Sequence, residues 1–187
     1  MKNAILNSDG LLYITGPGNK EKYLSTEDLP WKEQRNCIKA VEFAEGVKIR
    51  SLMNWFWGCK NLTEVKNWPE GVEDIAAAFC GCQSLAQLPK LPVTLRDMDE
   101  AFIDCISLSN VSVIPKNVIY TCDAFVRCRK LSGRMNLQGN ITQYAYMFQD
   151  AASEGTGLTL DYKEACAASI DGIIATGTDN IIKGICL

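Results

Sequence analysis

Cysteine is the residue type in this sequence with the most obvious chemical potential, because thiolates bind metals and act as nucleophiles. The chain contains nine cysteines, and four of them recur at an interval of 23 residues: Cys59, Cys82, Cys105 and Cys128. One residue separates Cys80 from Cys82, whereas zinc sites place two to four residues within each pair and converge tetrahedrally. A regular repeat would instead spread its sulfurs along a line. We therefore expect inert, buried thiols that pack as small hydrophobes, and neither a metal nor a cofactor. Disulfides remain open among the cysteines outside this phase: Cys37, Cys80, Cys122, Cys166 and Cys186.

Acid–base chemistry has little support in the sequence. There is no histidine, which removes the commonest general base and the Ser-His and Cys-His dyads. Four carboxylates gather at Asp97, Asp99, Glu100 and Asp104, but they lack the alternating loop and the glycine of a known calcium motif. We interpret them as a solvated convex face. The sequence predicts a protein that is not an enzyme.

Composition narrows the classes of partner. The chain has 187 residues and a net charge of −3 with both signs interspersed, which gives no electrostatic footprint for nucleic acid or an anionic membrane. No window approaches the roughly 18 apolar residues of a membrane span. We expect a monomer that inserts into no membrane. It is placed at the cell surface or secreted if a signal was trimmed, and in the cytoplasm if Met1 is the true start.

The elements that position these residues form a repeat. Five phenylalanines follow one another every 23 residues: Phe56, Phe79, Phe102, Phe125 and Phe148. A cysteine follows each of the first four after three residues, and a leucine after three more: Leu62, Leu85, Leu108 and Leu131. A proline follows in the first three units, at Pro69, Pro92 and Pro115. Such a period is typical of stacked repeats, and the prolines would break a helix in mid-unit. We predict about five coils, each with a short strand, a turn at the proline and one helical turn before the phenylalanine.

The segments outside this phase read as caps, because the open end of a repeat stack would expose its core. Residues 1–35 form the predicted N-terminal cap, with a strand at 11–15, a turn at 16–18 and a helical segment from Trp31 to Cys37. Trp31 and Tyr13 are expected to cover the first coil. Residues 36–150 carry the repeats. Residues 151–187 form a strand–helix–strand cap, in which Asp161 caps a helix to about Ala175 and residues 181–186 are the last strand.

The unit from Phe79 through Cys82, Leu85, Pro92 and Leu95 to Ala101-Phe102 resembles the BspA-type bacterial leucine-rich repeat. The segment from Gly10 to Gly18, with Pro30-Trp31 and residues 41–47, also resembles the entry segment of that family. The resemblance covers roughly residues 10–150. It implies a right-handed, β-rich α/β solenoid of leucine-rich coils with parallel strands. It also implies a surface or secreted bacterial protein that acts in adhesion or in binding a host or matrix partner. The last unit departs from the pattern, since Arg134 and Gln138 replace an aliphatic residue and the proline.

The polar positions on the strand side are the candidate binding surface, because a sheet of parallel strands displays such side chains in one column. We predict that they face outward and contact a protein or glycan ligand, although they are equally well read as solvated polar residues: Thr63, Lys66, Gln87, Asn110, Ser112, Arg134 and Asn136. Trp57 is a further candidate, but it leads an apolar row with Cys80, Ile103 and Val126 that we interpret as half-buried packing. The alternative function is a structural spacer or decoration module on a bacterial or phage surface assembly.

Overall fold

The computed structural model describes residues 3–16 and 25–187. Its elements in chain order are β1 (Ala4–Leu6), β2 (Leu11–Ile14), 3-10 helices Thr26–Asp28 and Lys32–Cys37, β3 (Ala40–Phe43), β4 (Glu64–Val65), β5 (Val113–Ile114), β6 (Gly133–Leu137), β7 (Leu158–Tyr162), 3-10 helix Glu164–Cys166, α1 (Ile170–Ile174) and β8 (Ile181–Cys186). The predicted turn at residues 16–18 lies largely outside the described part.

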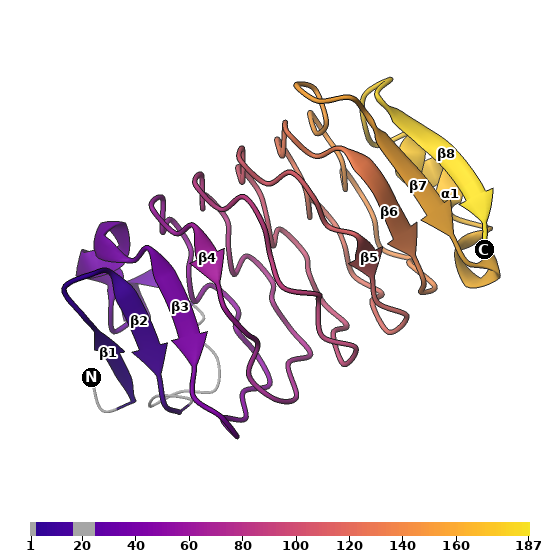
Figure 1. Cartoon of the computed structure of the whole chain (residues 1–187). Coiled ribbons are helices and arrows are strands. Elements are labelled where there is room, and N and C mark those ends of the chain that lie inside the picture. Colours follow the sequence, from indigo (N-terminus) through magenta and orange to yellow (C-terminus); the bar gives the residue numbers. More distant parts are fainter. Residues whose placement is uncertain (1–2, 17–24) are drawn as a thin grey trace.

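The chain is a β-solenoid whose coils stack into an elongated array, with the two termini at opposite ends (Figure 1). One four-stranded sheet has the order β1-β2-β3-β4 and the other β5-β6-β7-β8, and every pair except β1–β2 is parallel. The predicted repeat solenoid with parallel strands is confirmed, while the handedness of its coil stays a prediction. The prediction of about five coils was too low. The solenoid has about seven turns, since β2, β7 and β8 extend the stack beyond the repeated sequence pattern.

The core is a column of phenylalanine rings. All five repeat phenylalanines have no exposed surface, and successive ring centroids lie 5.4–5.6 Å apart with the rings stacked. The four leucines of the same phase are also fully buried. No single coil encloses this column, so each coil is stabilised by its neighbours.

The segment around each phenylalanine is a pair of tight turns, and the predicted helical turn there was wrong. Residues two positions before the five phenylalanines have left-handed backbones with φ between 51° and 64°: Asn54, Ala77, Glu100, Asp123 and Tyr146. A left-handed residue cannot lie within a right-handed α-helix. The backbone bonds between coils instead: Phe79 N–H donates to Ala101 O, and Phe102 N–H to Ala124 O, at 3.0 and 2.9 Å.

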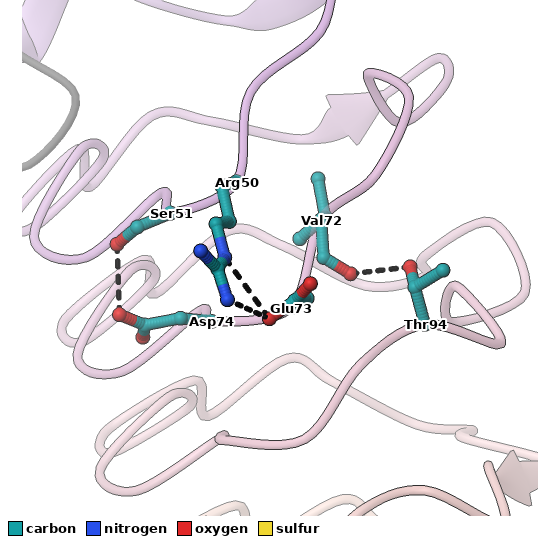
Figure 2. Close-up of polar contacts among 6 residues, drawn as sticks. All are labelled: Arg50, Ser51, Val72, Glu73, Asp74 and Thr94. Atoms are coloured by element: carbon teal, nitrogen blue, oxygen red, sulfur yellow. Dashed lines mark hydrogen bonds and ion pairs between the residues drawn. The ribbon is translucent and has the colours of Figure 1, made fainter.

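Polar side chains add bonds between successive coils. Arg50 Nη2 lies 3.0 Å from Glu73 Oε2, and Ser51 Oγ donates to Asp74 Oδ2 at 2.8 Å. Thr94 Oγ1 donates to the carbonyl of Val72. Figure 2 shows these three contacts between neighbouring coils. They fix neighbouring coils in a single register.

The two ends differ in detail from the predicted caps. Trp31 is buried and stacks on Phe56 at 6.3 Å, as expected. Tyr13 does not cover the core, because strand alternation in β2 turns Leu12 and Ile14 inward and leaves Tyr13 half-exposed. Asp161 does not cap a helix either: it belongs to β7, and the helix predicted to start there is reduced to the 3-10 helix Glu164–Cys166 and to α1. The predicted last strand is β8.

Candidate functional site

The structure places the predicted strand-side residues on one side of the solenoid. Six of the seven are exposed and Asn136 is half-buried. Thr63 and Lys66 flank β4, Asn110 and Ser112 precede β5, and Arg134 and Asn136 lie in β6, whereas Gln87 lies in a coil with no strand. Side chains in this column nevertheless fall into different environments, and only some of them surround open space.

A groove of about 430 Å³ lies between the coil of Gln87 and the coil of Asn110 and Ser112. Its polar lining also includes Lys90 and Gln138, and Lys90 is its only charged residue. Aliphatic side chains and prolines form the rest: Leu88, Pro89, Leu91, Val93, Val111, Val113 and Pro115. Sequence reasoning missed Leu88, Lys90, Val93 and Gln138. The signal that could have located the groove is Pro89, an additional proline found in this unit alone.

A second groove of about 440 Å³ lies on the other side of the same coil, where Thr63, Glu64, Val65 and Lys66 face residues 86–89. Its predicted residues are already engaged. Lys66 Nζ lies 2.8 Å from Glu42 Oε2, and this hydrogen bond raises the pKa of the lysine. Thr63 Oγ1 donates to Lys39 O at 3.0 Å. The predicted residues of the first groove are therefore the better candidates for contacting a ligand, because Thr63 and Lys66 in the second already bond to the neighbouring coil.

Arg134 and Asn136 line neither groove. Arg134 Nε and Nη2 donate to the two carboxylate oxygens of Asp161 at 2.8 and 2.5 Å. Asp161 also accepts the Ile185 N–H, and the hydrogen bonds from Arg134 lower the pKa of its carboxyl group. Within residues 3–16 and 25–187, Asn136 Oδ1 is buried with no hydrogen-bond partner. Arg134 thus joins β6 to β7 through Asp161.

Trp57 lies in the tight turn at Phe56, one of the row of turns around the repeat phenylalanines, and it lines neither groove. Its side chain is 38% exposed, and the guanidinium carbon of Arg35 lies 5.6 Å from the ring centroid, a cation–π contact. Cys80 and Ile103 in the same row are half-buried and Val126 is buried, which confirms the interpretation as packing. Because Arg35 occupies one face of the indole, that face is not open for stacking on a sugar.

The in-phase thiols have a structural partner. Cys82, Cys105 and Cys128 each donate from Sγ to the carbonyl of the phenylalanine 26 residues earlier, at 3.1, 3.1 and 3.0 Å. Burial raises the pKa of these thiols, and it raises that of Cys80 to about 11. All nine cysteines are free thiols.

The acidic residues do not converge either. Asp104 forms a bidentate pair with Arg127 at 2.5 and 2.7 Å. Burial, followed by the charges of Asp97, Glu100 and Asp123, raises the pKa of Asp99. In the described part of the chain, no three cysteine, aspartate or glutamate side chains form a group that could hold a metal ion.

The fold and the grooves define a class of protein, a repeat solenoid with an open strand face. No protein-family model matches the chain, and a comparison with curated proteins gives no significant match. Among the described residues, no helix has both the length and the apolar character needed to cross a membrane.

Proposed function

We propose that the protein is a non-enzymatic binding module that recognises a protein or glycan through the strand face of the solenoid. The observation that supports this proposal is the groove of about 430 Å³, because it brings Gln87, Asn110 and Ser112 together over an aliphatic floor. Binding sites combine such apolar surface with a few polar groups that fix orientation. The groove spans only two coils and the edge of a third, so we expect modest affinity for a single ligand.

We also propose a repeat family and a cellular location for the module. We propose that its coils are leucine-rich repeats of the BspA type, supported by the buried phenylalanine, cysteine and leucine of each unit. Adhesion at a bacterial cell surface, as a monomer, is the corresponding biological role. It rests on the resemblance of the repeat unit.

A binding screen of the purified chain against glycan and extracellular-matrix protein arrays tests the function. The double variant Asn110→Lys, Ser112→Lys fills the groove with two long cations, and we expect it to abolish any specific hit. Gln149→Arg is the matched control, because Gln149 is exposed in the row of turns and lines neither groove. A hit that survives the double variant would move the site away from the groove, and silence on both arrays would count against the module.

A structural spacer is the second candidate, and the stiffness of the stack favours it. The phenylalanine column runs without a gap from Phe56 to Phe148, and backbone bonds join every pair of successive coils along it. Such a rod holds its two ends at a fixed separation. If neither array gives a hit, the spacer function is the next to test. That test would start with the proteins encoded by neighbouring genes.

A further inference from the structure

The strand-side hydrogen-bond ladder is interrupted in the middle of the solenoid. Between the second and third repeat units the ladder begins with one regular hydrogen bond, in which Ser109 N–H donates to Ala86 O at 3.1 Å. The next groups form no backbone hydrogen bond within residues 3–16 and 25–187: Val111 N–H donates to no carbonyl, and the carbonyls of Leu88 and Lys90 accept no N–H. These three residues line the groove of about 430 Å³.

Pro89 lies beside the interruption and restricts the backbone of Leu88, the residue before it. It also has no N–H, so it removes one strand-ladder donor from its own coil. Residues 87–91 accordingly form no strand, and the two sheets end on either side of them, at β4 and at β5. In Figure 1 the chain between β4 and β5 carries no arrow.

Open backbone groups constrain what can occupy the groove. A covered N–H or C=O that loses its water without a new partner costs free energy, so such groups are almost always paired. A purely apolar ligand therefore does not fit. The side chains favour a peptide over a sugar, since the lining has aliphatic groups and amides but no aromatic ring to stack on a sugar. An extended peptide offers alternating donors and acceptors together with side chains for the aliphatic floor.

Length and charge narrow the partner further. One wall of the groove is the segment Gln87–Leu91, which is five residues long. An extended partner of about five residues would match its length. Lys90 is the single charge of the lining, so a peptide with acidic rather than basic residues is favoured.

We propose that this groove binds an extended peptide segment of about five residues, with aliphatic side chains at alternate positions and no lysine or arginine, whose backbone completes the interrupted ladder. The inference rests on the proposed binding function and specifies its ligand.

The first test is a selection of displayed random heptapeptides on the purified chain. The selected sequences should be aliphatic at alternate positions and poor in lysine and arginine. Lys90→Glu should shift the selection toward basic peptides, whereas Lys116→Glu, an exposed lysine outside the groove, should not.

The second test probes the backbone of the best selected peptide with a series of single N-methylations. Methylation at the residues that pair with the ladder should weaken binding several-fold, up to about tenfold, because each methyl group removes one hydrogen bond to the ladder. Methylation at the residues between them should have little effect. Amide exchange at Val111 should slow at least tenfold in the complex.

The outcomes separate the two proposals. A flat N-methylation series with unchanged exchange at Val111 would overturn the ladder inference and leave the binding function standing. Binding on the glycan array without any selected peptide would do the same. The absence of a ligand in the peptide selection and on both arrays would overturn the inference and the proposed function together.

Discussion

Replacing Phe102 with alanine tests the central claim of the fold, that stability comes from the phenylalanine column. Phe102 is fully buried, with the rings of Phe79 and Phe125 stacked on either side at 5.6 and 5.5 Å. Truncating a core phenylalanine costs about 3–5 kcal/mol in lost transfer free energy and cavity formation. Two stacked neighbours, each contributing about 0.5–1.5 kcal/mol beyond area burial, place the loss near the upper end, at about 5 kcal/mol.

Urea unfolding followed by circular dichroism measures this loss. With a slope of about 2 kcal/mol/M, the midpoint should fall by about 2.5 M. Phe102→Leu keeps most of the volume and should cost markedly less, whereas Tyr146→Ser removes a ring that is 61% exposed and should change the midpoint little. A loss below about 1 kcal/mol for Phe102→Ala would refute the argument, because the side chain could not then be part of a continuous column.

Three further predictions concern titratable groups. At pH 8 the exposed thiols of Cys37 and Cys186 should react with an aromatic disulfide reagent in the native protein, whereas Cys105, whose pKa burial raises, should react only after unfolding; equal rates would contradict the burial of the ladder. The native pKa of Asp99 is raised by burial, so its contribution to stability falls as pH rises above about 3.9. Asp99→Asn should therefore be more stable than the wild type at pH 7, as measured by urea unfolding, and the gain should vanish near pH 3. Asp161 has the opposite sign, because the hydrogen bonds from its arginine partner lower its pKa: the stability it contributes is present above about 3.9 and is lost as pH falls through the lowered value. Asp161→Asn should accordingly be less stable at pH 7, and the loss should shrink in strong acid.

The repeat architecture could be predicted because the sequence signal and the packing share one period. Each 23-residue unit delivers one phenylalanine, one cysteine and one leucine to the same inner positions, and all of them are buried. The turns around the phenylalanines were mistaken for a helical turn because the pattern of apolar residues is compatible with both. What decides between them is a left-handed residue before each phenylalanine, and non-glycine residues occupy all five of these positions.

The ends of the stack could not be predicted from the period. β2 and β7 pair with the repeats in parallel, but their coils have different lengths and lack the phenylalanine phase. Arg134 shows how a local departure is absorbed. It stands where the other units have an aliphatic residue, and the strand turns Met135 and Leu137 inward, which leaves the guanidinium outside to bond Asp161 in the next strand. That partner lies 27 residues away, in a segment whose register only the fold determines.

The position of the groove follows from the distribution of prolines among the units. The second unit has Pro89 and Pro92 in its strand segment and forms no strand; the first and third have one proline each and form the two-residue strands β4 and β5; the fourth has none and forms the five-residue strand β6. Each proline removes a donor from the ladder, so strand length falls as prolines accumulate. The repeat therefore places its polar residues in a column on every coil, and the column opens into a groove at the unit that carries the additional proline. The phenylalanine column and the strand ladder use different residues of the same coil, so the strand segment can vary from unit to unit while the column keeps its packing.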